Sequence, residues 1–444
     1  MSTAVAVKSK LDVYLEELIQ SCIANPGPGL LQDINKQAVE KLASSRLPDT
    51  KDEEWRFTDL SELFNIKFTP SQGVNITDAS EFILKEAKNT RLVFVNGIYA
   101  PHLSDVSGLP RGVYAGNLSG LSDSQKTGIG KYIEVKDTDE EVLGLLNSAG
   151  LQDVAVIWAE ENVVVETPIH LLYLSVAESG ATISQPRGVI IASPGASLSL
   201  VEYFGARSSH CSDLPQNKQY WTNALTKVFV GENAAVQHTR VQRESGDGYH
   251  TGKSTIEQGR DSRYTCHEIN LGAKLSRHTL HVFQCGENTQ TNLNALTLIG
   301  GTQVSDTHTA IYLSHPGGTT NQLHKCIIDD RAHAIFNGKV FVPKPAQLTN
   351  AAQLNRNLLL SPKARINTKP ELQITADNVK CSHGATVSQL EADEVFYLRS
   401  RGLNEDDARH LLIDAFAAEI LDKLPLESLR QRLNQCLSCR TIDR

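Results

Sequence analysis

The sequence predicts a mainly β protein with a right-handed parallel β-helix core, a mixed α/β domain before it and a helical domain after it. From about Asn162 onward, short runs rich in Val, Ile, Thr and Leu are interrupted every few residues by Gly, Asn, Asp or Ser, as strands and turns require. No helical spacing of apolar residues appears over roughly the next two hundred residues. Aromatic residues make up only 6% of the chain, so small and β-branched side chains must fill the interior.

A recurring pattern indicates that these strands stack as coils. A turn, a small residue and an alternating strand recur at intervals of 27 to 44 residues. This irregular repeat resembles a solenoid, whose coils bury their inward side chains by stacking, more than the hairpins of a β-sandwich or jelly roll, which are the alternative. We place the core at residues 156–385. The pattern begins at Gly195, Gly231, Gly259, Gly286, Asp330 and Ser361.

Residues 1–155 are predicted to form the mixed domain. Apolar residues in 11–22 follow the spacing of one helical face, and the Pro and Gly residues of 26–29 end that helix. A second helical stretch is predicted around 35–44. Residues 91–95 are predicted to form a strand that reverses through a tight Asn-Gly turn.

Residues 386–444 are predicted to form the helical domain. Its first helix lies around 395–398 and ends at Gly402, which suits the left-handed turn after a helix. Asn404 is placed to cap a second helix, and Pro425 opens a third. The apolar face that the second helix is predicted to bury comprises Ala408, Leu411, Leu412, Ala415 and Phe416.

Composition argues against several broad classes of protein. Lys and Arg number 43 against 51 Asp and Glu, a net charge of −8, whereas a general nucleic-acid binder carries a basic surface. The apolar runs are too short to span a membrane, and we expect neither a secretory signal nor an Arg-rich transit peptide. Eight cysteines in 444 residues are too sparse for a disulfide framework. We therefore expect a cytoplasmic protein with no nucleic-acid or membrane partner.

Histidine and cysteine are the candidates for metal chemistry, because eight of the 14 His and four of the 8 Cys lie between Cys266 and His383. A thiolate together with an imidazole suits iron, zinc or copper. No tetrad with zinc-ligand spacing occurs, and the Cys436 and Cys439 pair is isolated. Most of these side chains are expected to fill the solenoid interior. A metal-storage or zinc protein is an alternative that requires bound metal in the isolated chain.

Cys381 and His383 form a distinct pair. They alternate onto one face of a strand at the end of the β region, directly before the helical domain, and Gly384 follows them. A thiol and an imidazole at such an edge lie where a second chain can complete metal coordination.

The segment KCSHGATV at 380–387 and its continuation FYLRSRG at 396–402 resemble the C-terminal signature of the SufB/SufD family, which belongs to the SUF iron-sulfur cluster assembly system. The order of a mixed domain, a β-helix and a helical domain is similar as well. The Trp-Arg-Phe-Thr segment at 55–58 also resembles an N-terminal segment of the family. Within the family, the Cys-Ser-His-Gly motif is closer to the SufD branch than to SufB.

This resemblance implies a non-catalytic scaffold. SufD pairs with SufB through the two β-helices and binds the SufC ATPase through the helical domain, so ATP hydrolysis belongs to SufC. His383 matches the family's interface histidine, which contributes with a SufB cysteine to a nascent cluster; Cys381 is its neighbour. The isolated chain is expected to bind no cofactor, and a homodimer is one arrangement it could adopt when alone. Iron or a cluster is expected only transiently, at the interface with SufB. The implied SufC contacts are Phe396, Tyr397, Arg399, Arg401, Leu411 and Phe416.

The alternative from a different class is a carbohydrate-active β-helix enzyme of the polysaccharide lyase kind. Such an enzyme places acidic or basic catalytic groups in an exterior groove and is usually exported. The N-terminal sequence and an ordinary distribution of carboxylates count against it. Activity on polyuronides, as opposed to co-purification with an ATPase, separates the two functions.

Overall fold

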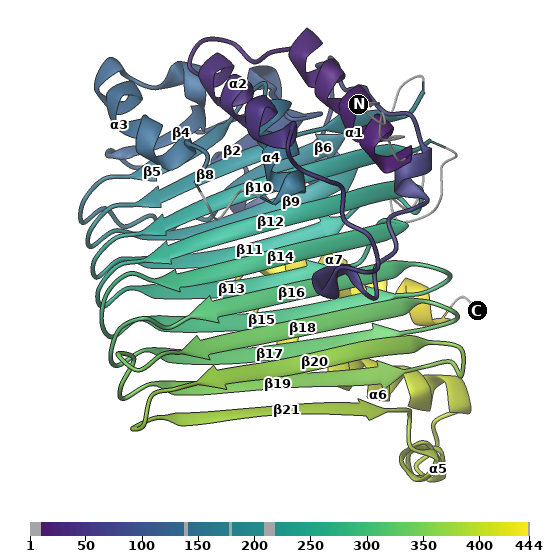
Figure 1. The fold of residues 1–444 in the computed structure, drawn as a ribbon. Coiled ribbons are helices and arrows are strands. Elements are labelled where there is room, and N and C mark those ends of the chain that lie inside the picture. The colour runs from purple at the N-terminus through teal and green to yellow at the C-terminus, as the bar shows by residue number, and fades with distance from the viewer. Residues whose placement is uncertain (1–9, 137–140, 177–179, 208–217, 443–444) are drawn as a thin grey trace, which may run out of the picture.

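The computed structural model describes residues 10–136, 141–176, 180–207 and 218–442, with side chains up to Ser438. Two largely parallel sheets, here called sheet A and sheet B, stack face to face and form a right-handed β-solenoid of about seven turns (Figure 1). Each turn adds one strand to each sheet. The predicted mainly β class and stacked-coil core are therefore confirmed.

Sheet A has eleven strands and sheet B has ten. From β8 to β21, strands of even number belong to sheet A and strands of odd number to sheet B. Sheet A contains β1 (Thr69–Pro70), β4 (Val113–Asn117), β5 (Ala155–Ala159), β7 (Thr182–Ser184), β8 (Arg187–Ala192), β10 (Tyr220–Val230), β12 (Gly248–Gln258), β14 (Leu275–Gln284), β16 (Val304–Tyr312), β18 (His333–Val342) and β20 (Arg365–Ile374). Sheet B contains β2 (Arg91–Val95), β3 (Ile98–Tyr99), β6 (Ile169–Ser175), β9 (Ser197–Ala206), β11 (Ala235–Arg243), β13 (Arg263–Asn270), β15 (Gln290–Ile299), β17 (Thr319–Ile328), β19 (Asn350–Leu359) and β21 (Lys380–Ser388).

One corner of the solenoid explains most of the repeat seen in the sequence. Where the chain passes from sheet A to sheet B, one residue has a positive φ, and its N–H bonds to a carbonyl of the next coil. Asn, Asp and Gly tolerate this conformation and hold six of the seven positions, and the last passage, from β20 to β21, has no residue with a positive φ. The patterns that start at Asp330 and Ser361 lie at the opposite corner, where the chain passes from sheet B to sheet A. The 44-residue interval between Gly286 and Asp330 is long because the pattern moves from one corner to the other. The corner residues are Asn162, Gly195, Asn233, Asp261, Asn288, Gly317 and Leu348.

The N-terminal region follows its predicted pattern with one shift. Helix α1 buries Leu15, Leu18, Ile19 and Cys22 on its predicted face, whereas α2 begins at Leu31, ahead of the predicted stretch at 35–44. Strands β2 and β3 form the predicted hairpin. Strands β2 and β4 also pair with β6 and β5, so this region extends both sheets. The helices are α1 (Lys10–Ala24), α2 (Leu31–Leu42), α3 (Asp123–Ile133), α4 (Val142–Ala149), α5 (Ala392–Ser400), α6 (Glu405–Leu421) and α7 (Glu427–Ile442).

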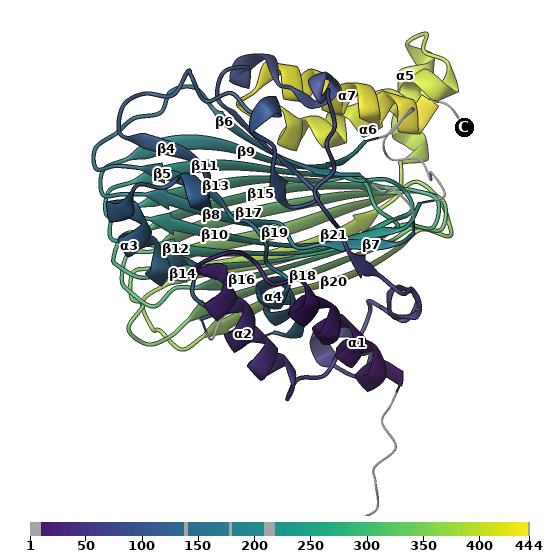
Figure 2. The same cartoon turned by 90° about the horizontal axis from the view of Figure 1, so that it is seen from above.

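Helices cover the outer faces of both sheets (Figure 2). Helices α1, α2 and α4 share an apolar cluster with the start of sheet A, and α6 and α7 share another with sheet B and residues 76–103. The domain boundaries near residues 155 and 386 stay predictions. Among the described helices, none has both the length and the apolar composition needed to cross a membrane.

The C-terminal helices confirm the predicted caps but not the predicted face of α6. Gly402 has a φ of 100°, and the Asn404 Oδ1 accepts a hydrogen bond from the Asp407 N–H at 2.8 Å. Helix α7 buries Leu429, Leu433, Cys436 and Leu437 on one face. In α6, however, only Ala408 of the predicted face is fully buried, because sheet B lies against an adjacent stripe of the helix. That stripe comprises Ile413, Ala417, Ile420 and Leu421.

A network of ion pairs lies between the two sheets in the middle coils. The Arg240 Nη2 lies 2.6 Å from His250 Nε2, and His250 Nδ1 lies 2.6 Å from Glu244 Oε2. Because arginine only donates, His250 accepts at Nε2 and carries its proton on Nδ1, facing Glu244. Glu268 Oε1 lies 2.7 Å from His278 Nδ1 and 3.6 Å from Arg240 Nη1. His250 and His278 thus belong to a polar network and do not merely fill space.

Candidate functional site

The solenoid is open at its C-terminal end. Strands β20 and β21 are the last strands of sheets A and B, and within the described residues no strand pairs with their outer edges. We call these two edges the rim. Ile374 and Val387 are exposed at the rim although their register partners, Val342 and Asn357, are buried. Free backbone groups beside exposed apolar side chains suit pairing with a strand edge of another chain.

Strand β21 brings Cys381 and His383 to the rim. Their register partners on β19 are Ala351 and Gln353, which are buried between the sheets. The two side chains therefore continue interior rows, and His383 is exposed because no further coil covers it. Cys381 is half-buried against the interior apolar cluster, and this burial raises the pKa of its thiol. The two residues lie together as the sequence predicts, and their role stays a prediction.

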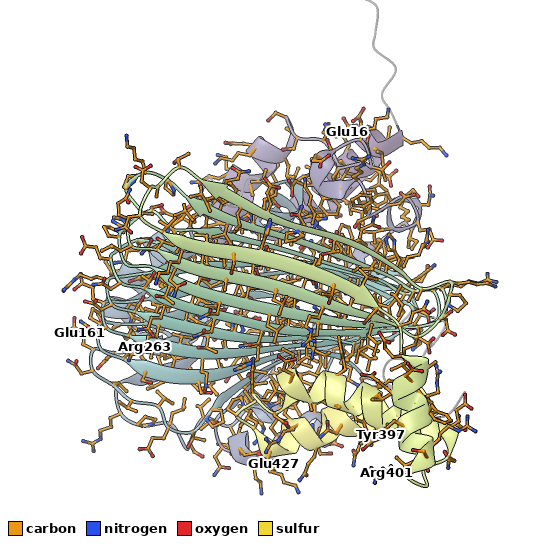
Figure 3. All side chains as sticks on the ribbon, turned by 90° about the horizontal axis from the view of Figure 1, so that it is seen from below. Glu16, Glu161, Arg263, Tyr397, Arg401 and Glu427 are labelled. Atoms are coloured by element: carbon orange, nitrogen blue, oxygen red, sulfur yellow. The ribbon has the colours of Figure 1, made fainter. Side chains whose placement is uncertain are left out.

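The strand that carries His383 leads directly into the helical region, since only three residues separate β21 from α5. Phe396, Tyr397 and Leu411 are 71%, 57% and 49% exposed, and we call these three residues the cap patch. The Arg401 guanidinium lies 5.2 Å from the centre of the Tyr397 ring. Figure 3 shows Tyr397 and Arg401 on the helices beside the sheets.

The other predicted SufC contacts divide into two groups. Arg399 is exposed near the cap patch and pairs with Glu405 at 3.2 Å, which links α5 to α6. Phe416 is half-buried and lies against sheet B, with its ring centre 4.1 Å from the Lys325 ammonium. Five of the six predicted residues therefore lie on or near the exposed side, and Phe416 does not.

In the described part of the chain, no three His, Cys, Asp or Glu side chains form a group that could hold a metal ion. Cys381 and His383 supply two potential ligands at the rim. Cys436 is buried in α7, and the side chain of Cys439 lies outside the described residues. A metal or cluster at the rim therefore needs further ligands from a second chain, and the zinc-protein alternative gains no support.

A segment that sequence reasoning did not place crosses the outer face of sheet A. The Arg277 guanidinium lies 3.7 Å from the centre of the Trp55 ring, and Thr58 Oγ1 donates to Asp306 Oδ2 at 2.5 Å. Glu54 Oε2 accepts from His308 Nδ1 at 3.2 Å. The resemblance marked Trp55 to Thr58, but nothing local in the sequence signals contacts with strands more than two hundred residues away.

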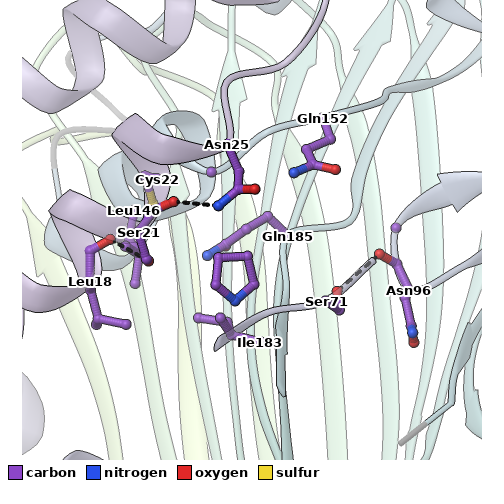
Figure 4. A pocket seen from close by; sticks show the side chains of 13 residues that line it. Leu18, Ser21, Cys22, Asn25, Ser71, Asn96, Leu146, Gln152, Ile183 and Gln185 are labelled. Atoms are coloured by element: carbon purple, nitrogen blue, oxygen red, sulfur yellow. Dashed lines mark hydrogen bonds between the residues drawn. The ribbon is translucent and has the colours of Figure 1, made fainter. Parts of the chain in front are cut away.

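Two hollows lie away from the rim. A cleft of about 610 Å³ lies between residues 46–55 and sheet A, and the charged residues that line it pair with one another or with neighbours, as Glu54 does with His308 and Lys339. This pairing leaves little scope for the acidic or basic catalysis of a polysaccharide lyase. A pocket of about 30 Å³ beside Cys22 and Gln185, shown in Figure 4, has room for little more than water.

Two family models cover most of the chain. The SufBD core domain of the SUF FeS cluster assembly system matches residues 174–416, and the SufBD protein N-terminal region matches residues 9–171. The chain belongs to the SufBD family. The SufBD core match contains β21, the rim and the cap patch.

Three relatives show how far the SufBD similarity extends. An iron-sulfur cluster assembly SufBD family protein of Synechocystis is 51% identical over 98% of this chain and 97% of its own length. The chloroplastic protein ABCI7 of Arabidopsis thaliana is 36% identical over 97% of this chain and 92% of its own. The iron-sulfur cluster assembly protein SufD of Escherichia coli is 31% identical over 90% of each chain. The resemblance drawn from the motifs is confirmed, and the carbohydrate-active alternative gains no support.

Proposed function

We propose that this chain is a SufD-type scaffold subunit, which pairs with SufB through the rim, binds the SufC ATPase through the cap patch and catalyses no reaction itself. The observation that carries the proposal is an exposed imidazole, His383, on the terminal strand β21, whose outer edge pairs with no strand in the described part of the chain and which leads into the helices α5 and α6 that bear the cap patch. One short stretch of chain thereby joins a ligand to a partner-binding surface.

The chemistry of the rim favours a shared and transient site. An imidazole is a ready metal ligand, whereas burial raises the pKa of the half-buried Cys381 thiol and so disfavours the thiolate form that binds metal. His383 is therefore the principal ligand from this chain, and a thiolate has to come from SufB. Iron or a nascent cluster is cargo here, and a site divided between two chains releases it when the chains separate.

Replacing His383 with Ala is expected to reduce cluster formation by the reconstituted complex with SufB and SufC about tenfold or more, because one ligand is lost. The fold should be unaffected, since the side chain is exposed. Absorbance and circular dichroism of the cluster measure its formation, and gel filtration checks assembly of the complex. The matched control is Ser382→Ala, an exposed neighbour on the opposite face of β21. Undiminished cluster formation by the His383 variant would reject the ligand role.

The cap patch has the character of a protein-binding surface. Large apolar and aromatic side chains exposed on the consecutive helices α5 and α6 are costly to leave in water, and Tyr and Phe are frequent anchors of interfaces. The arginines beside Tyr397 add a polar margin. Because α6 docks on sheet B through a different stripe, the cap patch stays free to meet a partner.

The double substitution Phe396→Ser with Leu411→Ser is expected to weaken SufC binding about 100-fold, since two anchors are lost. Isothermal titration calorimetry with purified SufC measures the affinity. Val13→Ser is the matched control, because Val13 is a comparably exposed apolar residue in α1. Equal affinity of the double variant and the unaltered chain would contradict the assignment.

The rim also permits pairing of two copies when SufB is absent. Residues 361–388 contain four Lys or Arg and two Asp or Glu, so two identical rims would bring like charges together. A partner with a more acidic rim is preferred for this reason, and we propose the heterodimer as the working state. We place the protein in the cytoplasm on its sparse cysteines, although the Arabidopsis relative is named as chloroplastic.

A further inference from the structure

Helix α6 is held on sheet B by a polar contact as well as by its apolar stripe. The Glu419 Oε2 accepts from Lys325 Nζ at 2.5 Å and from Arg356 Nη1 at 3.2 Å. Lys325 and Arg356 are register partners on neighbouring strands, β17 and β19. One carboxylate oxygen of α6 thus accepts hydrogen bonds from side chains of two neighbouring strands.

Lys325 depends on this contact, because its side chain is only 2% exposed. A buried ammonium is costly unless a partner neutralises it, and Glu419 does so while the Phe416 ring covers the charge at 4.1 Å. Burial works to lower the pKa of Lys325, and Glu419 opposes that shift. The apolar stripe with Ile413 and Ala417 has no charge to neutralise, whereas the buried Lys325 ammonium keeps its partner only while Glu419 stays beside it.

From Arg356 the linkage continues to the strand that carries His383. Thr386 on β21 is the register partner of Arg356, and it lies three residues from His383. The neighbouring Asn357 donates from Nδ2 to the Thr386 carbonyl at 2.9 Å, and Ser388 Oγ lies 3.4 Å from the Asn357 carbonyl. A displacement of Glu419 therefore reaches β21 through the Arg356 side chain and then through β19, which is paired with β21 along its length.

We propose that Glu419 is a positioning residue, which with Lys325 and Arg356 forms an ionic clamp that couples movement of α6 to the strand bearing His383. This inference rests on the proposed function, in which SufC binds the cap patch and His383 serves the cluster site. Helix α5 and strand β21 are joined covalently, so the clamp supplies the second attachment. Because the helices are attached both by the chain between β21 and α5 and by Glu419, a displacement of the helices also displaces the last coils of the solenoid.

The test uses the reconstituted complex with SufB and SufC and compares the Glu419→Gln variant with the unaltered chain. The readout is the rate of Cys381 alkylation, mapped by peptide mass spectrometry, with and without ATP. Cys381 lies two residues from His383 and is half-buried, so its reactivity reports the state of the rim. In the unaltered complex we expect ATP to change this rate, and in the variant we expect that change to shrink about tenfold.

Two further variants separate coupling from folding. Lys325→Met combined with Glu419→Met removes the buried charge together with its partner, which restores packing but not the clamp. This double variant is expected to fold and bind SufC normally while the ATP response of Cys381 stays lost. Glu427→Gln removes an exposed ion pair with Arg430 on α7 and should leave the response intact.

The outcomes are distinguishable. If Glu419→Gln and the double variant both respond to ATP as the unaltered chain does, the clamp is rejected while the proposed function stands. If the unaltered complex assembles but shows no ATP response at Cys381, the clamp alone is rejected. If the complex fails to assemble, the proposed function falls and the clamp with it. Loss of the ATP response with SufC affinity within about twofold of normal supports the clamp.

Discussion

Replacing Arg240 with Met is expected to lower the free energy of unfolding by about 3–5 kcal/mol, the usual cost of removing one member of a buried ion-pair network. Arg240 lies in the solenoid interior with its guanidinium 5.1 Å from the centre of the Phe204 ring. Methionine retains much of the volume, so the loss comes from the charge. Urea unfolding followed by circular dichroism measures it.

The physical reason is that the Arg240 guanidinium offsets the negative charge of several buried carboxylates. Glu202, Glu244 and Glu268 are all buried between the sheets. Burial works to raise the pKa of Glu268, but His278 and Arg240 outweigh it and hold that pKa below its usual range. Without the guanidinium these carboxylates have to take up protons or remain as uncompensated buried charges.

The control for Arg240 is Arg260→Met, which removes an exposed pair with Glu232. Exposed pairs contribute about 0–1 kcal/mol, so this change should have little effect. A loss below about 1 kcal/mol for the Arg240 variant would mean that the interior network is not held together by its charges.

The second large effect is acid destabilisation between pH 6.5 and pH 4. Burial lowers the pKa of His170 to about 3 and the pKa values of His267, His281 and His324 to about 4. A histidine whose folded pKa is depressed contributes stability above its unfolded pKa, near 6.5, and that stability is lost as the pH falls toward the folded value. Each of the four should therefore lose about 2 kcal/mol by pH 5.

His308 acts in the opposite direction. Burial works to lower its pKa, but Asp306 and Glu54 outweigh burial and raise it. Its contribution is fully present below pH 6.5 and declines as the pH rises through the folded value. One histidine does not offset four, so the fold should weaken steeply in mild acid.

Urea midpoints measured at pH 7 and pH 5 check this expectation. In a His324→Asn variant the difference in unfolding free energy between the two pH values should be smaller by about 2 kcal/mol. Ser382→Ala serves as the control, because that side chain is exposed and does not titrate. Identical pH dependence of the unaltered chain and the His324 variant would sink the explanation.

Local patterns in the sequence determined the elements of this protein and the motif at its rim. The Asn, Asp and Gly corners, the strand alternation and the helix caps act over a few residues, so the coils, the Asn96-Gly97 turn and the Asn404 cap were all predictable. Cys381 and His383 were found for the same reason, since they lie two residues apart on one strand.

Only the tertiary structure decided which surfaces meet. The buried stripe of α6, the position of Phe416 against Lys325 and the path of residues 46–58 over sheet A depend on partners far away in sequence. Thr58 and Asp306, for example, are 248 residues apart. Helical spacing offers α6 two adjacent apolar stripes, and it is packing on sheet B that selects one and leaves Leu411 exposed. Long-range choices of this kind are made by packing and charge pairing, which leave no periodic signal in the chain.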